Sequence, residues 1–254
     1  MRRTAFALSL ALTLVLVCSA ARADPREDFL AGRARDCVRC DLSGMNFKRR
    51  DFSEADLSGS NLRGTNFHDA KLAGARLAGA DLSGANLNKA NLSRADLGGA
   101  ILRAVMLYAA ILDGARLTGA DLTDALMATA RLTRCDLGQA ILRNADLRKS
   151  RLAEAIMAGA DLTAAALDFA FMRGAQLDGA LLKEARLTGA ELISATLIGA
   201  DLTEVQAIGA NFRAADLSRA VLVGADFRRA NLHDAKLDDV VYRDTVMPDG
   251  TVRP

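Results

Sequence analysis

The sequence has no Trp, and only 4% of its residues are aromatic, although 51% are apolar. An ordinary globular core in a chain of 254 residues uses more large side chains than this. The three Pro residues, Pro25, Pro248 and Pro254, lie near the ends, so nothing in the middle indicates a linker or a domain boundary. Ala, Leu, Asp and Gly dominate instead. We therefore expect one domain with a narrow core built from one small unit used many times.

Histidine is also scarce, because His68 and His233 are the only two in the chain. Acidic residues are abundant, but no residue pattern pairs a nucleophile with a base. A zinc site needs about four ligands, and no such set of Cys and His residues occurs. The sequence therefore predicts a protein that is not an enzyme and that has no cofactor and no metal site.

The first residues differ from the rest in composition. An Arg pair at 2–3 precedes an apolar run at 5–17, and the small residues of an Ala-Arg-Ala segment at 21–23 follow. This order is typical of a secretory signal peptide with its cleavage site. We expect a signal peptide at 1–23 and a mature chain that begins at Asp24 and is periplasmic or secreted.

Other interpretations of this leader remain open. It could be retained as an N-terminal anchor, although the apolar run is short for a membrane span. Lipidation of Cys18 is less well supported, because the bulky Val17 stands where a small residue is needed. The Arg pair resembles a twin-arginine signal only loosely.

Charges nearly cancel. The chain has 33 basic and 31 acidic side chains and a formal net charge of +2. The leader contains three Arg and no acid, so its removal leaves 30 basic against 31 acidic side chains and a net charge of −1. A nearly neutral protein has no long-range field that attracts a polyanion. We expect no nucleic-acid partner, and no membrane span in the mature chain.

A period of five residues runs through most of the sequence. From Leu42 to Met247, every residue whose number ends in 2 or 7 is large and apolar, at 42 positions without an insertion or deletion, and only Ala207 is small. The residue two places earlier is mostly Ala. This period fits neither a helix nor a strand. It fits a chain that turns a corner every five residues, points one large and one small side chain inward, and gains its core by stacking.

Two of these units, Ala80-Asp81-Leu82-Ser83-Gly84 and Ala85-Asn86-Leu87-Asn88-Lys89, are near-ideal copies of the pattern A-[D/N]-L-x-x. Over residues 40–247 the sequence thereby resembles the pentapeptide-repeat family. The resemblance implies an all-β fold, a right-handed quadrilateral β-helix in which four units close a coil of 20 residues. Coils stacked at strand spacing, about 4.8 Å apart, would form a rod roughly 50 Å long.

A cap segment is expected at the N-terminal end of this solenoid, over residues 24–39. Asp24 is a good N-cap, a Pro follows at the first helical position, and Glu27 would complete a capping box. We expect a short capping helix that ends near Arg35 and lays Phe29 over the first coil. Without a cap, the end of the solenoid would expose its sheet edges.

The other end carries a turn signal, Met247-Pro248-Asp249-Gly250, and then a C-terminal tail at 248–254. Central Phe residues gather toward both ends, where a bulky side chain can close a tapering core. They are Phe47, Phe52, Phe67, Phe212 and Phe227.

Outward residues 20 apart should lie above one another and form vertical ladders. One ladder alternates in charge through Asp56, Arg76, Asp96, Arg116 and Asp136. On a second side, units that carry Asp with Ser or Thr alternate with units that carry an apolar residue and a cation. In order, these are Asp81 with Ser83, Ile101 with Arg103, Asp121 with Thr123, Ile141 with Arg143, Asp161 with Thr163, and Leu181 with Lys183. Opposite charges at strand spacing contribute about 0.2–1 kcal/mol per pair. We expect these ladders to fix the register of the stack rather than to bind ligands.

A column of Gly has the same spacing, at residues 59, 79, 99, 119, 159, 179 and 199. It indicates one corner of the coil that needs a positive φ. A phosphate-binding loop is the alternative, but no transition from strand to helix follows these residues.

Large apolar residues at outward positions are the main candidates for function. Met106, Tyr108 and Leu126 should adjoin on one side, and Phe169 and Phe171 should bracket a corner three coils further on. A contiguous exposed patch would indicate a surface for a protein partner or for self-association. The alternative is that these are scattered apolar residues on a chain rich in Ala and Leu.

Cys37 and Cys40 form a C-x-x-C pair, and in an exported protein a disulfide between them is the first expectation. A redox-active pair would be expected at the start of a helix, whereas this pair follows one. Cys135 occupies an inward Ala position nearly five coils away and is expected to be a buried free thiol.

Together these observations favour a non-catalytic, exported structural or protein-interaction scaffold with an unknown protein partner or with self-association. The resemblance implies one alternative, because some pentapeptide-repeat proteins mimic duplex DNA and protect DNA gyrase. Such mimicry requires a strongly acidic exterior and a cytoplasmic location, and this sequence departs from both requirements.

Overall fold

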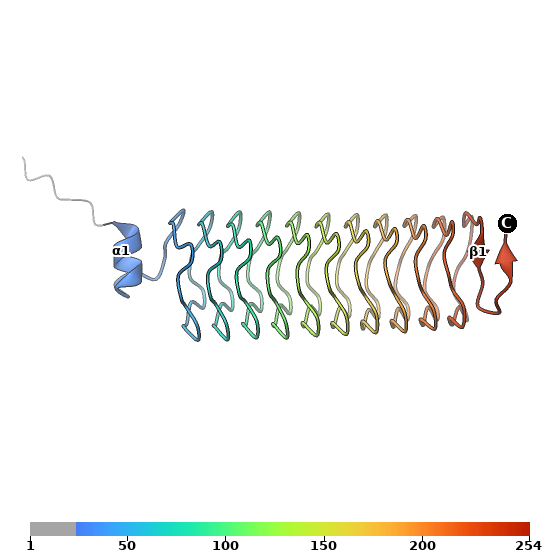
Figure 1. The fold of residues 1–254 in the computed structure, drawn as a ribbon, viewed down its shortest axis with the longest axis horizontal. Helices are drawn as coiled ribbons and strands as arrows, with labels where there is room; N and C mark the ends of the chain where they lie inside the picture. Colours follow the sequence, from blue (N-terminus) through green and yellow to red (C-terminus); the bar gives the residue numbers. More distant parts are fainter. Residues whose placement is uncertain (1–23) are drawn as a thin grey trace, which may run out of the picture.

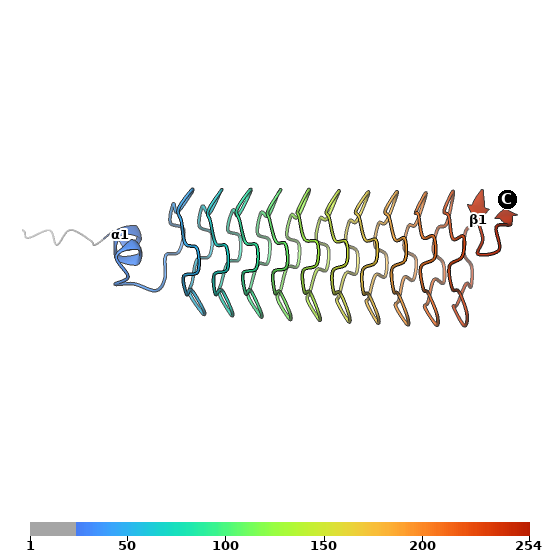
Figure 2. The same ribbon diagram turned by 60° about the horizontal axis from the view of Figure 1, so that its bottom comes forward.

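The computed structural model describes residues 24–254. They form a straight rod of stacked coils, with helix α1 (Pro25–Leu30) at one end and the strands β1 (Thr245–Val246) and β2 (Val252–Arg253) at the other (Figures 1 and 2). The predicted signal peptide at 1–23 lies outside the described residues. Between residues 24 and 254, no helix has the length and hydrophobicity needed to cross a membrane.

Each coil contains 20 residues. Isolated parallel bridges join residues 20 apart along the whole rod, from Asp41↔Asn61 to Asp226↔Val246. Four five-residue units therefore make the four sides of a coil. The predicted fold, a right-handed quadrilateral β-helix with a short N-terminal capping helix, is confirmed.

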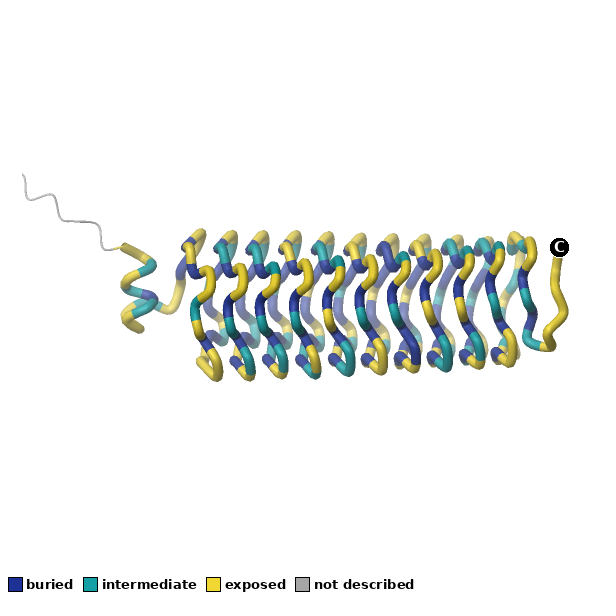
Figure 3. Tube along the Cα trace, in the orientation of Figure 1, coloured by how far each residue is buried: buried dark blue, intermediate teal, exposed yellow. Residues whose placement is uncertain are grey.

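Burial repeats with the same period. A unit is counted here from a residue whose number ends in 1 or 6, so that its second and fifth residues point inward and the other three point outward (Figure 3). In the unit 81–85, for example, Leu82 and Ala85 have no exposed surface. The stacked Leu and Ala residues of successive coils form one continuous core along the rod.

The backbone hydrogen bonds of a unit explain its preference for Asp or Asn at the first position. In the unit 81–85, the first, second and fourth N–H groups donate to carbonyls of neighbouring coils at 3.0, 2.7 and 2.9 Å. The fifth donates within the unit at 2.9 Å. The third, the N–H of Ser83, is left over and donates to the carboxylate of Asp81 at 3.0 Å. An Asp or Asn side chain thus satisfies the one N–H that the stack does not use.

This contact is present in every unit from 41–45 onward that begins with Asp or Asn. The first residues concerned are Asp41, Asn46, Asp51, Asp56, Asn61, Asn66, Asp81, Asn86, Asn91, Asp96, Asp121, Asp136, Asp146, Asp161, Asp201, Asn211, Asp216, Asp226 and Asn231.

Every corner of the coil, and not one corner only, has a left-handed backbone. The fourth residue of each unit from Arg39 to Asp244 has a φ between about +50° and +70°. The Gly column at one corner satisfies this requirement without strain, but many of these residues are not Gly. The stack of hydrogen bonds therefore imposes the left-handed conformation on ordinary side chains, at a cost that Gly avoids.

Helix α1 ends at Leu30 and not near Arg35. Gly32 has a φ of +72° and donates its N–H to the carbonyl of Phe29 at 3.0 Å, while the next N–H donates to the carbonyl of Asp28 at 2.8 Å. These are the two hydrogen bonds of a Schellman motif, which terminates a helix. The N-cap is as expected at Asp24, whose carboxylate accepts from the N–H of Arg26 at 2.9 Å, but the described residues contain no reciprocal bond to Glu27.

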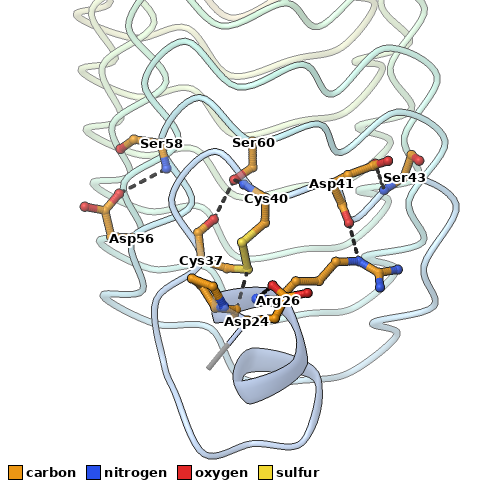
Figure 4. The surroundings of a disulfide bond; sticks show 10 residues. Asp24, Arg26, Cys37, Cys40, Asp41, Ser43, Asp56, Ser58 and Ser60 are labelled. Atoms are coloured by element: carbon orange, nitrogen blue, oxygen red, sulfur yellow. Dashed lines mark hydrogen bonds between the residues drawn. A yellow bond between two sulfur atoms is a disulfide. The ribbon is translucent and has the colours of Figure 1, made fainter. Parts of the chain in front are cut away.

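Phe29 covers the first coil as expected. It is 2% exposed and lies in contact with Phe52, at 5.4 Å between ring centroids, and with Phe47 at 6.0 Å. The Arg26 guanidinium Nε donates to the carbonyl of Asp41 at 2.6 Å and fixes the helix to the coil (Figure 4). The cap therefore closes the core by stacking aromatic rings.

Cys37 and Cys40 form a disulfide at the junction of the cap and the solenoid (Figure 4). The Ser60 hydroxyl donates to the carbonyl of Cys37 at 2.6 Å and accepts from the N–H of Cys40 at 3.1 Å. The N–H of Cys37 already donates to Asp56 of the next coil at 2.8 Å. The hydrogen bonds of the stack thus begin at Cys37.

Replacing both Cys37 and Cys40 with Ser is expected to lower the free energy of unfolding by about 2 kcal/mol, because the disulfide closes a loop of only four residues in the unfolded chain. The same loss is expected for the wild-type chain under reducing conditions. Thermal unfolding with and without reductant measures it. If the double variant melts at the wild-type temperature in both conditions, the disulfide does not stabilise the cap.

At the C-terminal end, β2 folds back on β1 in an antiparallel pair, so the predicted tail returns over the last coil. The turn forms where it was predicted, with the N–H of Met247 donating to Thr251 at 2.7 Å. Tyr242 and the inward residues near it are only partly buried. This end is covered less completely than the N-terminal end.

Candidate interaction surface

The candidate patch lies on two of the four sides. Met106 and Leu126 are bridged neighbours in adjacent coils, and Tyr108 lies two residues beyond Met106 on the same side. Tyr108 is 51% exposed and Leu126 is 50% exposed. With Ala128 they line a shallow depression of about 320 Å³, the Tyr108 depression.

Phe169 and Phe171 do not reach the Tyr108 depression. They line a separate depression of about 410 Å³ together with Lys149. Phe171 also borders a neighbouring depression of about 380 Å³ with Arg151. Of the five predicted residues, Tyr108, Leu126, Phe169 and Phe171 are exposed and Met106 is partly buried, and the five form two surfaces rather than one.

An ion pair borders the Tyr108 depression on the side nearer to Phe169. Arg148 donates to both carboxylate oxygens of Asp146, from Nε at 2.7 Å and from Nη2 at 2.6 Å. Hydrogen bonds from the Arg148 side chain outweigh the effect of burial and hold the pKa of the Asp146 carboxyl below its ordinary value. Both residues line the Tyr108 depression, so its apolar floor ends at a charged rim.

The ladders occupy much of the remaining surface. Asp56 and Arg76 are bridged neighbours and form an ion pair at 3.5 Å, and Arg116 binds Asp96 at 2.6 Å. On the second side, where units with Asp alternate with units that carry a cation, each cation binds the Asp of the following coil at 2.5 to 3.1 Å. These pairs are Arg63–Asp81, Arg103–Asp121, Arg143–Asp161 and Lys183–Asp201. On each of these two sides, ion pairs join side chains of adjacent coils, as the sequence predicted.

One column departs from the alternation of opposite charges, and the sequence analysis missed it. Arg131 and Arg151 are direct bridged neighbours, and they are the only pair of like charges among the isolated bridges of residues 24–254. Arg131 is compensated by an ion pair with Asp113. Reading every column at intervals of 20 residues would have found the Arg–Arg pair, because both residues are first in their units.

The described residues contain no arrangement that suggests catalysis. Within 24–254, no group of three or more His, Cys, Asp and Glu side chains is placed to hold a metal ion. Cys135 is fully buried, and burial raises the pKa of its thiol, which keeps it protonated and unreactive. His233 is exposed and contacts Asp234 at 2.8 Å.

The sequence profile described as Pentapeptide repeats matches residues 36–69, 65–103, 85–124, 100–139, 130–168, 170–205 and 208–241. The chain belongs to the pentapeptide-repeat family. No curated protein matches it in a sequence search.

Solved structures agree with this assignment. The chain is similar to HetL, a pentapeptide repeat protein involved in heterocyst differentiation regulation from the cyanobacterium Nostoc sp. strain PCC 7120. The identity is 31%, the alignment covers 90% of this chain and 97% of HetL, and the TM-score is 0.69.

Two further structures have lower TM-scores and lower coverage. A trypsin-treated form of QnrB1, a plasmid-mediated fluoroquinolone resistance protein, is 19% identical, with 81% of this chain and 90% of QnrB1 covered and a TM-score of 0.43. A pentapeptide repeat protein from the Arabidopsis thaliana thylakoid lumen is 33% identical, with 41% and 69% covered and a TM-score of 0.30.

Proposed function

We propose that this chain is an exported, non-catalytic scaffold that binds a protein partner through the Tyr108 depression. The observation that carries the proposal is the apolar cluster of the partly buried Met106 with the half-exposed Tyr108 and Leu126. One adjacent side and the opposite side of the rod are occupied by ion-pair ladders instead. Large exposed apolar residues that lie together on a soluble surface are typical of interaction sites. Tyr is well suited to such a site, because it buries a large rigid ring and keeps a polar end.

The shape of the rod supports a scaffold role. Each unit of the solenoid has five residues and no insertion, so no long loop is available to build an enclosed catalytic pocket. Repeat arrays of this kind present extended, rigid surfaces to partners. The perturbed pKa values of Asp121 and Asp146 arise in ion pairs and turns of the stack, which requires no catalytic explanation.

Export is supported by the predicted signal peptide at 1–23 and by the disulfide between Cys37 and Cys40. Structural disulfides persist in oxidising compartments and are rare in the cytosol. The free thiol of Cys135 is compatible with such a compartment, because it is fully buried.

Mimicry of DNA is not favoured by the surface. A mimic needs carboxylates that are free to imitate phosphates, whereas many carboxylates of this rod are bound to Arg or Lys of a neighbouring coil. The charge of the mature chain is close to zero.

Substitution of Tyr108 with Asp tests the proposal. It introduces a charge into the floor of the depression, so recovery of partner from cells crosslinked before lysis should fall by about tenfold or more. The circular dichroism spectrum and melting temperature should stay as in wild type, because position 108 is outward. The matched control is Ala78→Asp, which places the same charge on the opposite side of the rod. Equal recovery with both variants would contradict the proposal.

A further inference from the structure

We propose that a second site on the rod binds a segment of a protein partner that presents a carboxylate next to a large apolar side chain. The site, named here the aromatic–basic site, consists of Lys149, Arg151, Phe169, Phe171 and Arg173. The inference rests on the proposed scaffold function and adds the chemistry of the partner.

The ladder at this site carries an uncompensated charge. Arg151 lies between Arg131 and Phe171 in one column. Like charges directly opposite one another destabilise adjacent strands. In the other ladders of the described rod, each charged residue is bridged to an opposite charge or to an uncharged residue. Arg131 has Asp113 as its partner, whereas Arg151 has no carboxylate within ion-pair distance among the described residues. A cation at position 151 therefore does not stabilise the stack of coils. This favours a role for Arg151 outside the stack.

Nearby cations are also unpaired. Lys149 and Arg173 are exposed and form no ion pair within the described part of the chain. The carboxylates around them are engaged elsewhere, in the pairs Arg134–Glu154 at 2.8 Å, Arg148–Asp146 at 2.6 Å and Arg186–Asp168 at 2.6 Å. Glu191, which is bridged to Phe171, is the one adjacent carboxylate without an ion pair in these residues. Three unpaired cations therefore face one unpaired carboxylate.

The backbone supplies further donors. Arg151 and Phe171 replace the usual Asp or Asn at the first position, so the N–H groups of Ala153 and Arg173 have no hydrogen-bond acceptor in residues 24–254. In the unit 81–85 the equivalent N–H binds a carboxylate at 3.0 Å. Other units that lack Asp or Asn also leave this N–H unpaired, but these two lie beside unpaired cations. A carboxylate from a partner has both a charge and an N–H donor to bind here.

The apolar half of the site is formed by two exposed rings. Phe169 is 53% exposed and Phe171 is 45% exposed. Phe169 has a φ of +58°, a conformation that a bulky residue adopts at a cost, and its ring covers Gly189 of the next coil. The position would be less strained with Gly, which occupies many of the other corners.

The two halves are continuous. Phe171 borders both the depression that contains Arg151 and Ala153 and the depression that contains Lys149 and Phe169. A segment that lies across Phe171 can therefore place its carboxylate at Arg151 and its apolar side chain against Phe169. The charge complementarity selects an acidic and apolar segment over a basic one.

A library of displayed random peptides, selected on the mature wild-type chain, tests this inference. Peptides with Asp or Glu close to Phe, Leu, Ile or Trp should be enriched. A synthetic peptide from this set should bind Arg151→Gln and Phe171→Ser about tenfold or more weakly than wild type, and Arg213→Gln unchanged. Arg213 is a suitable control because it is an exposed cation on the same side two coils away. Backbone amide resonances of Ala153 and Arg173 should shift on titration.

The stability of the variants separates binding from folding. Arg151→Gln removes a like-charge contact, so its melting temperature should not be lower than that of wild type. Lost binding at an unchanged or raised melting temperature supports the site. Lost binding with a lowered melting temperature in both variants would overturn it.

Other results would also overturn the inference. Enrichment of basic or purely apolar peptides, or no enrichment, contradicts the predicted chemistry. Peptides that fail to bind Tyr108→Asp but bind Arg151→Gln normally would leave the scaffold function intact and exclude the second site. If light scattering shows oligomers that Arg151→Gln dissociates, the occupant is a second copy of the chain and not a different protein.

Discussion

Replacing Leu122 with Asp should unfold the middle of the solenoid. Leu122 has no exposed surface, and the central residues directly below and above it, Leu102 and Leu142, are buried to the same extent. A carboxylate at this position is surrounded by aliphatic side chains and meets no cation. A buried charge without a partner costs about 3–5 kcal/mol, and each coil depends on its neighbours for burial.

The expected result is loss of the single cooperative transition and proteolytic cleavage near residue 122, measured by circular dichroism during heating and by limited proteolysis. The control is Leu122→Met, because Met127, Met157 and Met172 occupy equivalent central positions and are fully buried. This volume-conserving change should cost less than about 1.5 kcal/mol. An Asp variant that melts like wild type would contradict the assignment of inward and outward positions.

Acid should unfold the rod cooperatively. The hydroxyl and N–H of Ser218 hold the pKa of the Asp216 carboxyl below its ordinary value of 3.8. Burial raises the pKa of Asp121, but hydrogen bonds from Thr123 and Arg103 outweigh it, so the pKa of Asp121 is lowered as well. Lowered pKa values recur along the rod, at Asp41, Asp51, Asp56, Asp81, Asp96, Asp146, Asp161, Asp201 and Asp226.

A carboxyl whose pKa is lower in the folded state than in the unfolded state binds fewer protons when folded. Its stabilising effect is complete above the unfolded value, near 3.8, and is lost as the pH falls through the folded value. The melting temperature should therefore be constant between pH 5 and 7 and should fall by more than about 10 °C between pH 5 and 2.

Asp216→Asn is the informative comparison. Asn86, Asn91 and Asn211 occupy equivalent positions and accept the same N–H bond without titrating. The variant loses an exposed ion pair with Lys236, so it should be slightly less stable than wild type at pH 7 and lose less stability in acid. A melting temperature that stays constant down to pH 2 in wild type would contradict the role assigned to the Asp side chains.

The fold was predictable because its information is local and repeated. The central residues from Leu42 to Met247 specify the inward column, and residues 20 apart specify the ladders. The backbone requirements of the corners were not visible in the same way. Sequence reasoning found a positive φ only where Gly forms a column, whereas residues such as Phe169 adopt it because the hydrogen bonds of the stack fix the chain on both sides.

The candidate surface was predicted in part. Exposure of Tyr108, Leu126, Phe169 and Phe171 follows from their positions in the unit. The division of the patch did not follow, because the contact between Arg148 and Asp146 depends on side-chain rotamers. The helix length was overestimated for a similar reason, since its end is decided by the two hydrogen bonds around Gly32 and not by composition.

The measurement that tests the account most directly is photo-crosslinking in intact cells from two positions of the same coil. A photoreactive residue at position 108 lies in the Tyr108 depression, and one at position 118 lies on the opposite side. The account predicts a discrete protein adduct from position 108, with at least about tenfold lower yield from position 118. Equal adducts from both positions, or none from position 108, would contradict the claim that the function of this rod lies in its exposed apolar surface.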